Sequence, residues 1–179
     1  GIANTFLAAT GMPVGQSLYE PELLHDAQDI IQNMHHEGMM MPLPSDVRVA
    51  TSFSPDAKAS VKDVSEITED EMILDIGPQT QLQYTDIIRQ CQTILWNGPV
   101  GVFEFEAFSS GTKCIAETIA DHDCYSLAGG GDTIAAIEKF GIIDKISYIS
   151  TGGGAFLSLL EQGTLDTIEL LKSKENTYQ

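Results

Sequence analysis

The stretch SLAGGGDTIAAIEKF, from Ser126 to Phe140, places three consecutive glycines between a short apolar run and a segment with the spacing of a helix. Glycines that join a strand to a helix let a phosphate group approach backbone N–H groups at the positive end of the helix dipole. A second triple-glycine turn, Gly152 to Gly154, follows the next apolar run. Two such turns favour an α/β fold with an anion site.

Apolar runs and helical segments alternate along most of the chain. Predicted strands cover 47–53, 72–76, 93–97, 124–128 and 146–150, and predicted helices cover 5–9, 21–37, 82–91, 111–120, 133–140 and 155–160. Strands separated by helices of this length pair in parallel through right-handed crossovers. The pattern therefore predicts a single α/β domain with a doubly wound, mostly parallel sheet and helices on both faces, which is Rossmann-like. Ser109 or Ser110 is expected to cap the helix over 111–120.

Four predicted strands each end in a glycine turn: Gly77-Pro78, Asn97-Gly98-Pro99, Gly129 to Gly131, and Gly152 to Gly154. Carboxyl ends of parallel strands lie along one edge of a sheet, so the four turns are expected to line one crevice. For Gly77-Pro78 taken alone, ordinary loop punctuation is the simpler explanation. Neither GxxxxGK[ST] nor the spacing GxGxxG is found, which disfavours a P-loop ATPase and a standard NAD-binding domain.

An acid, Asp132, directly follows the first triple-glycine turn. Asp at the start of a helix is a good N-cap. A carboxylate beside polyphosphate would be repelled unless a cation lay between them, so Asp132 also predicts Mg²⁺. Both roles stay open, and Thr133 either offers a hydroxyl to the site or is an ordinary first-turn residue. Glu104 is either a solvated loop acid or an acceptor for ribose hydroxyls, and Trp96 is expected in the core.

Composition restricts the class of partner. The 179 residues are 42% hydrophobic and carry 26 Asp plus Glu against 9 Lys plus Arg, a formal net charge of -17. This charge argues against nucleic acid or an acidic membrane as the main partner, although backbone amides and a metal ion can still hold a small phosphorylated molecule. Three cysteines without a CxxC pair fit reduced thiols, and no apolar run approaches the ~18 residues of a membrane span. A cytoplasmic location is expected.

The motifs WNGPVGVFE (96–104), AGGGDT (128–133) and STGGGA (150–155) resemble the nucleotide-binding half of phosphoglycerate kinases. GIANTF, VGQSLYE and LDIGP are similar to further segments of that family in the same order, so the resemblance covers nearly the whole chain. It implies a nucleotide-binding C-terminal domain over 1–170 and a polar tail over 171–179. The implied activity is the reversible, Mg²⁺-dependent glycolytic transfer of a phosphoryl group between 1,3-bisphosphoglycerate and ADP, which gives 3-phosphoglycerate and ATP.

The resemblance also implies roles for individual residues, which fall into four sets. They are Gly152, Gly153 and Gly154 at the transferring phosphoryl group; Gly129, Gly130, Gly131, Asp132 and Thr133 at the phosphates, with Asp132 as metal ligand; Glu104 at the ribose; and Gly1, Leu18, Gly77, Asn97 and Pro99 around the adenine or the nucleotide channel.

The chain opens on GIANTF without an initiator Met, so it is expected to be a cut from a longer polypeptide. In the family that the motifs resemble, the 3-phosphoglycerate site, a catalytic arginine and the phosphate-binding lysines precede this start, and the full-length protein would be a monomer. The nearest cations to the glycine turns, Lys113, Lys139 and Lys145, fall in helices or beyond them. The chain alone is therefore expected to bind Mg-nucleotide weakly and to transfer no phosphoryl group.

Two other classes of protein stay open. A non-catalytic, nucleotide-binding regulatory module would share the glycine crevice and need no catalytic lysines. An oxidoreductase of the same doubly wound class would need a dinucleotide instead. The segment 156–171 departs from the pattern of the kinase family, which leaves the packing of the C-terminal part open.

Overall fold

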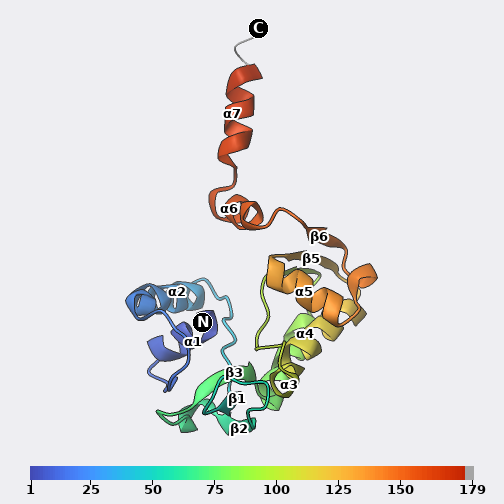
Figure 1. The fold of residues 1–179 in the computed structure, drawn as a ribbon. Coiled ribbons are helices and arrows are strands. Elements are labelled where there is room, and N and C mark those ends of the chain that lie inside the picture. The colour runs from blue at the N-terminus through green and yellow to red at the C-terminus, as the bar shows by residue number, and fades with distance from the viewer. Residues whose placement is uncertain (176–179) are drawn as a thin grey trace.

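Two three-stranded sheets organise the chain in the computed structural model, which describes residues 1–175 (Figure 1). The first sheet has the order β2-β1-β3 and is antiparallel, with β1 over Asp46–Ala50, β2 over Ser60–Asp63 and β3 over Met72–Ile76. The second has the order β4-β5-β6 and is parallel, with β4 over Thr93–Trp96, β5 over Tyr125–Gly129 and β6 over Tyr148–Ser150.

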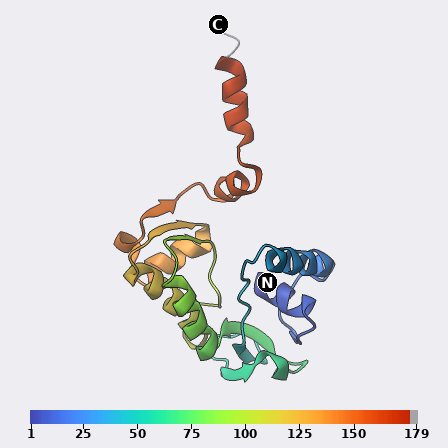
Figure 2. The same cartoon turned by 180° about the vertical axis from the view of Figure 1, so that it is seen from behind.

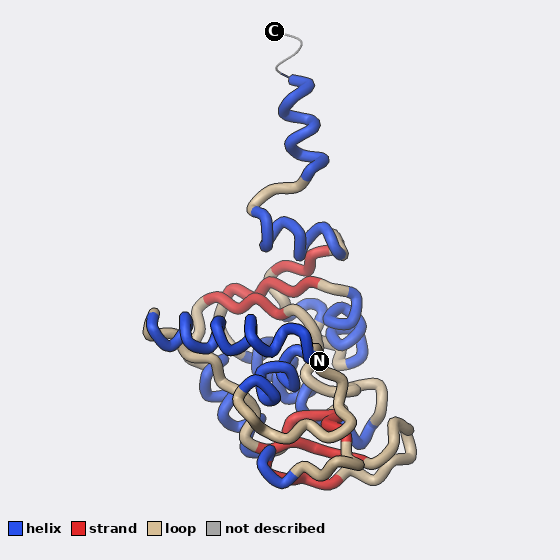
Figure 3. Tube along the Cα trace, turned by 90° about the vertical axis from the view of Figure 1, so that its left-hand side faces the viewer, coloured by secondary structure: helices blue, strands red, loops and turns tan. Residues whose placement is uncertain are grey.

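Two helices precede the first sheet, three lie in the chain between β3 and β6, and two follow the parallel sheet. They are α1 (Ile2–Ala9), α2 (Leu24–His36), α3 (Pro78–Ile88), α4 (Ser110–Asp121), α5 (Gly131–Lys139), α6 (Gly154–Gln162) and α7 (Asp166–Glu175). The tube in Figure 3 shows the parallel and antiparallel sheets as separate units joined by helices and loops. The α/β class and a parallel sheet with crossover helices are thus confirmed.

The structure differs from the single sheet predicted for all the strands. Strands β1 and β3 pair with each other in antiparallel fashion and contribute nothing to the parallel sheet. The reason lies in the connection between Ala50 and Met72, which contains β2 and a short 3-10 turn over Val64–Glu66 but no crossover helix. Antiparallel neighbours need no such helix, whereas parallel neighbours do.

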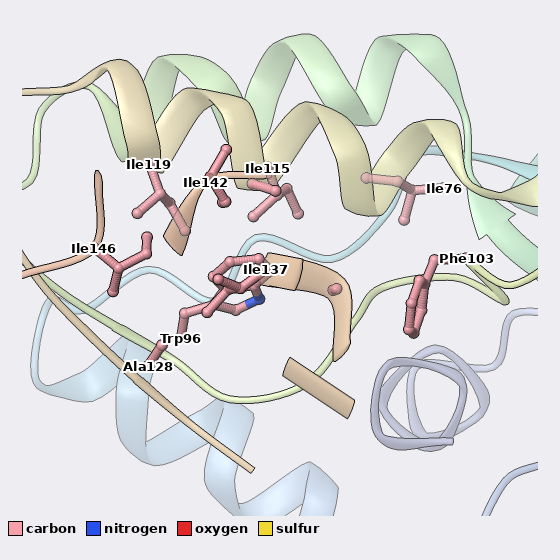
Figure 4. Close-up of a cluster of buried hydrophobic side chains, with 11 residues drawn as sticks. Ile76, Trp96, Phe103, Ile115, Ile119, Ala128, Ile137, Ile142 and Ile146 are labelled. Atoms are coloured by element: carbon pink, nitrogen blue, oxygen red, sulfur yellow. The ribbon is translucent and has the colours of Figure 1, made fainter. Parts of the chain in front are cut away.

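One face of the parallel sheet carries the main core. Trp96 of β4 and Ala128 of β5 pack with Ile137 of α5 and Ile115 of α4, as Figure 4 shows. Trp96 is 6% exposed and Ile137 is fully buried, so the expected core position of Trp96 is confirmed. Burial of an isoleucine side chain such as Ile137 stabilises the fold by roughly 1.5–3 kcal/mol relative to exposure.

The other face of the parallel sheet is largely uncovered. Leu95, Leu127 and Tyr148 stand side by side in register across the three strands. Leu95 is 46% exposed, and Tyr125 and Tyr148 are each 54% exposed. Parallel sheets are ordinarily covered on both faces. The prediction of helices on both faces therefore does not hold for the residues that the structure describes.

A buried carboxylate joins the antiparallel sheet to α3. Asp46 of β1 is 5% exposed, and its carboxylate accepts hydrogen bonds from the N–H groups of Gln79 (3.0 Å) and Thr80 (2.7 Å). These groups lie in the first turn of α3, where backbone donors have no partner within the helix. A negative charge is also favourable at this end of the helix dipole.

A second carboxylate joins the same sheet to α4. Asp75 of β3 accepts a hydrogen bond from the Gly111 N–H at 2.8 Å and one from the Ser110 hydroxyl at 3.2 Å. Ser109 is the N-cap residue, but its hydroxyl donates to the Glu106 carbonyl and it makes no side-chain capping bond. The prediction that Ser109 or Ser110 caps α4 was wrong, because a strand distant in sequence supplies the acceptor.

The last two helices extend away from the rest of the chain, as the two opposite views in Figures 1 and 2 both show. Phe156, which is 8% exposed, anchors α6, whereas Leu170 and Leu171 of α7 are 56% and 65% exposed. The predicted polar tail over 171–179 begins within α7, and residues 176–179 lie outside the described residues. Within residues 1–175, every helix is too short or too polar to cross a membrane.

Replacement of Asp46 tests the first of these carboxylate bridges. Asp46→Ala leaves two N–H groups at the start of α3 without an acceptor, so we expect the free energy of unfolding in urea to fall by about 1–3 kcal/mol. Asp63, an exposed acid that caps a short 3-10 turn, gives the control: Asp63→Ala is expected to cost no more than about 1 kcal/mol. Equal losses in the two variants would contradict the bridging role of Asp46.

Candidate functional site

Three of the four predicted glycine turns meet at the carboxyl edge of the parallel sheet. They are the turn after β4 at Asn97 to Pro99, the turn after β5 at Gly129 to Gly131, and the turn after β6 at Gly152 to Gly154. The second turn leads directly into α5 and the third into α6. The first N–H groups of α5 make no hydrogen bond among the described residues, so this turn presents donors at the edge. At the start of α6 the N–H groups of Ala155 and Phe156 donate to the Gly152 and Gly153 carbonyls, so the free donors there are those of Gly153 and Gly154.

The fourth predicted turn lies elsewhere. Gly77 is buried at the end of β3, where it is the N-cap residue of α3 and donates its N–H to the Asp46 carbonyl at 2.8 Å. A Cβ on Gly77 would overlap the Asp46 carboxylate. Gly77 is therefore a glycine because of close packing against Asp46, and it does not line the crevice with the other turns.

A hydrogen bond joins the first turn to the second. The Gly98 N–H donates to the Thr133 hydroxyl at 2.6 Å, and the Trp96 indole N–H donates to the Gly98 carbonyl at 3.0 Å. Thr133 is fully buried. Its hydroxyl is thus engaged within the protein, which favours a positioning role for Thr133 over direct contact with a ligand.

Backbone conformation requires glycine at two positions of the turns. Gly130 has a φ of +94° and Gly153 has a φ of +53°, conformations that residues with a Cβ rarely adopt. Gly129 has a different reason, because a Cβ there would overlap the ring of Phe156 from α6. The glycines after β5 and β6 therefore serve both the turn geometry and the packing of the two turns against each other.

Asp132 is exposed in the first turn of α5. The N-cap residue of this helix is Gly130, and the helix start makes no side-chain capping hydrogen bond. The carboxylate is thus presented to solvent beside the glycine turn. Within residues 1–175, no group of three or more His, Cys, Asp or Glu side chains could hold a metal ion, so a cation at Asp132 would need phosphate or water as further ligands.

A cleft of about 610 Å³ lies between α1 and the loop after β4, and of the three turns it is the one at Asn97 to Pro99 that lines it. Its lining includes three of the predicted nucleotide-channel residues, Gly1, Asn97 and Pro99. Leu18, which is 74% exposed, adjoins Gly1: a Cβ on Gly1 would stand 3.8 Å from its side chain. The volume falls within the range of small-molecule sites.

The other residues of the cleft wall were not predicted from the sequence. It comes from residues 41–44, from β3 and from Tyr84 of α3, which lie far apart in sequence. The Tyr84 hydroxyl donates to the Pro42 carbonyl at 2.7 Å, and burial raises the pKa of Tyr84 to about 12, so it stays a donor at neutral pH. Nothing local in the sequence marks these residues, because the contacts arise only in the folded chain.

Glu104 lies in the loop that leaves the cleft. It is exposed and follows Val102, which lines the cleft, by two residues. A second groove, of about 760 Å³, runs between α3 and α4 and contains none of the predicted site residues. The candidate site is therefore the smaller cleft together with the three glycine turns.

The cations nearest to the turns in sequence are engaged elsewhere. Lys139 donates to the Phe103 carbonyl and lies 5.8 Å from the centre of the Phe103 ring. Lys145 pairs with Asp121 at 2.7 Å, and Lys113 lies 3.8 Å from a Glu117 oxygen. The described residues that line the cleft include no Lys or Arg.

A parallel sheet with helix-starting glycine turns along its carboxyl edge and a cleft beside them defines an open-sheet α/β domain of the kind that binds ligands at that edge. The sequence profile described as phosphoglycerate kinase matches residues 1–163. The chain belongs to the phosphoglycerate kinase family, and it spans less than half the length of the relatives that it matches.

Individual relatives agree with this assignment. A phosphoglycerate kinase from Francisella philomiragia is 54% identical over 174 residues, which make up 97% of this chain and 44% of that protein. The structure of phosphoglycerate kinase from Coxiella burnetii has a TM-score of 0.92 at 50% identity and covers 96% of this chain, which in turn covers 44% of it. The enzyme from Pyrococcus horikoshii OT3 gives a TM-score of 0.73 at 32% identity, with coverages of 88% and 40%.

Substitution of Thr133 tests the link between the first two turns. Thr133→Val keeps the volume of the side chain but removes the acceptor of the Gly98 N–H, so hydrogen exchange of the Gly98 amide is expected to speed up by about tenfold or more, which corresponds to about 1.4 kcal/mol. Thr133→Ser keeps the hydroxyl and serves as the control. Unchanged protection of Gly98 in Thr133→Val would show that this bond does not hold the loop.

Proposed function

We propose that this chain is the nucleotide-binding part of a phosphoglycerate kinase, in which residues 1–170 form the nucleotide-binding domain. The whole enzyme would transfer a phosphoryl group reversibly between 1,3-bisphosphoglycerate and ADP. The observation that carries this proposal is the meeting of three glycine turns at one sheet edge beside a cleft of nucleotide size. Membership of the kinase family supports the choice of a nucleotide over other anions.

The proposed binding mode follows from the chemistry of the walls. The apolar part of the cleft, which includes Ile73, Leu74 and Val100, suits the adenine base. Gly1, Leu18, Asn97 and Pro99 would border the base or the channel that leads to it. Gly77 would not touch the nucleotide but would support Ile76, which lines the cleft. Glu104 would accept hydrogen bonds from the ribose hydroxyls.

The phosphates would then lie across the glycine turns. Gly129 to Gly131 would hold the phosphates at the start of α5, with Thr133 fixing the adjoining loop, and Gly152 to Gly154 would contact the transferring phosphoryl group at the start of α6. Asp132 fits a magnesium site, because its carboxylate is exposed beside donors suited to phosphate. A Mg²⁺ ion there would offset the repulsion between this carboxylate and the nucleotide.

The proposed site is incomplete for catalysis. Phosphoryl transfer requires positive groups to neutralise charge on the moving phosphoryl group and a site that positions the carboxylate acceptor, 3-phosphoglycerate. Lys139, Lys145 and Lys113 are held by partners elsewhere in the chain. The acceptor site and the missing cations would come from the more than half of the family's length that this chain does not span.

Calorimetric titration of ADP tests the metal assignment. We expect Mg²⁺ to tighten ADP binding by the native chain, and Asp132→Ala to lose about tenfold in Mg-ADP affinity or more, equivalent to about 1.4 kcal/mol. Asp144, an exposed acid in the connection to β6, supplies the control variant Asp144→Ala, which should bind as the native chain does. If the native chain binds ADP with the same affinity in the presence and absence of Mg²⁺, Asp132 is not a metal ligand.

An assay of the isolated chain tests whether it can transfer a phosphoryl group by itself. Purified chain with Mg-ATP and 3-phosphoglycerate is expected to give no turnover above background in a coupled assay, because the cations that stabilise the transferring group are elsewhere. A full-length family member serves as the positive control under the same conditions. Turnover by the 179-residue chain would refute the proposed incompleteness.

A further inference from the structure

One buried carboxylate holds the strand that backs the cleft against the loop that forms its wall. Asp75 is fully buried, and its Oδ1 accepts the Ile76 N–H at 2.9 Å. Its Oδ2 accepts the Gly111 N–H at 2.8 Å and the Ser110 hydroxyl at 3.2 Å. Both oxygens are thus engaged, and the carboxylate fixes the point at which the loop after β4 enters α4.

A β-bulge presents this carboxylate. Asp75 is paired with Arg48 and Ile73 with Val49, so Leu74 is an extra residue between two consecutive pairs. A bulge bends its strand and re-aims the neighbouring side chains. The carbonyl of Leu74 accepts the Val102 N–H at 2.8 Å, so the bulge contacts the loop through its backbone as well.

Two glycines close on the carboxylate from the loop and from α4. A Cβ on either Gly101 or Gly111 would overlap the carboxylate of Asp75. Gly101 and Val102 also line the cleft. The position of this carboxylate therefore decides where the Gly101–Val102 wall stands, and Glu104 follows Val102 by two residues.

We propose that Asp75 is the positioning residue of the nucleotide cleft. It acts through the loop from Asn97 to Ser109, whose place it sets relative to β3 and α4, and it does not touch the nucleotide. The proposal rests on the proposed function for the identity of the ligand. Its mechanical part, the placement of the loop, rests on the contacts of Asp75 alone.

The burial of Asp75 and the charges around it allow a second test, the dependence of stability on pH. Burial raises the pKa of Asp75 to about 6, against the opposing effect of its hydrogen bonds and of the Arg48 charge on β1. The Arg48 Nε is buried without a hydrogen-bond partner among the described residues. Lys113 on α4 and the loop acids Glu104 and Glu106 are exposed.

The sign of the pH effect follows from this raised pKa. Between the ordinary value of 3.8 and about 6, the folded protein holds a proton on Asp75 that the unfolded chain has released. The free energy of unfolding of the native chain should therefore rise, relative to that of Asp75→Asn, as the pH falls from 7 towards 5. A difference that does not change with pH would contradict the raised pKa of Asp75.

Affinity for ADP is the first measurement. Asp75→Asn keeps the size of the side chain and removes the charge and one acceptor, so we expect a loss of tenfold or more in ADP affinity. The matched control is Glu71→Gln. Glu71 precedes β3, is 7% exposed, and accepts from Lys62 Nζ and the Thr68 N–H at 2.8 and 2.9 Å, neither of which belongs to the loop. This control should bind ADP within about twofold of the native chain.

Fluorescence of Trp96 separates the placement of the loop from the identity of the ligand. Trp96 is the single tryptophan, and its indole donates to the Gly98 carbonyl at 3.0 Å. Asp75→Asn should change its emission and increase quenching by acrylamide, and Glu71→Gln should not. If the native chain binds no ADP, the proposed function is wrong. The emission and quenching of Trp96 would still show whether Asp75 holds the loop in place.

A double-mutant cycle provides the decisive comparison. Gly101→Ala pushes a methyl group against the carboxylate, so it should displace the loop by itself, even if Asp75→Asn does not fold. Asp75→Ala removes the carboxylate but keeps the Cβ of residue 75, which would stand 2.9 Å from that methyl group, so the Gly101→Ala change should cost clearly less in that background. Strict additivity of the two substitutions in Trp96 quenching, or native quenching in Gly101→Ala, overturns the proposal.

Discussion

Two carboxylates buried between an antiparallel sheet and the starts of two helices determine how this molecule is assembled. Asp46 binds the first turn of α3, and Asp75 binds the first turn of α4. Removing each carboxylate from water is unfavourable, and this cost is offset by hydrogen bonds from backbone donors that would otherwise lack partners. Because α4 also packs on the parallel sheet, the two sheets cannot shift independently without breaking buried hydrogen bonds.

The candidate site is a product of this assembly. The parallel sheet alone brings the three glycine turns to one edge, as the topology requires. The cleft needs the antiparallel sheet as well, since Ile73, Leu74 and Ile76 of β3 form its back wall. The anion-binding half thus follows from one sheet, and the apolar half follows from the way in which the second sheet is attached.

Much of this could be predicted from local sequence, and the remainder depends on distant contacts. Strands and helices from Thr93 to Gln162 follow from apolar periodicity and glycine turns, which are local signals, whereas α7 was not among the predicted helices. Strand β2 has no such signal, since Ser60, Val61 and Asp63 are all exposed. The serines before α4 match a capping pattern, yet the acceptor is Asp75, 36 residues from Gly111. Pairing between distant strands decides that choice, and no single window of sequence contains it.

The lining of the cleft has a consequence for the kinetics of association. With a formal charge of -17 and no Lys or Arg among the described residues that line the cleft, the chain presents a polyphosphate with a repulsive long-range field. Added salt screens this repulsion over about 10 Å at 0.1 M. Nucleotide should therefore meet the isolated chain faster as ionic strength rises, the reverse of the electrostatic steering found in sites built around fixed cations.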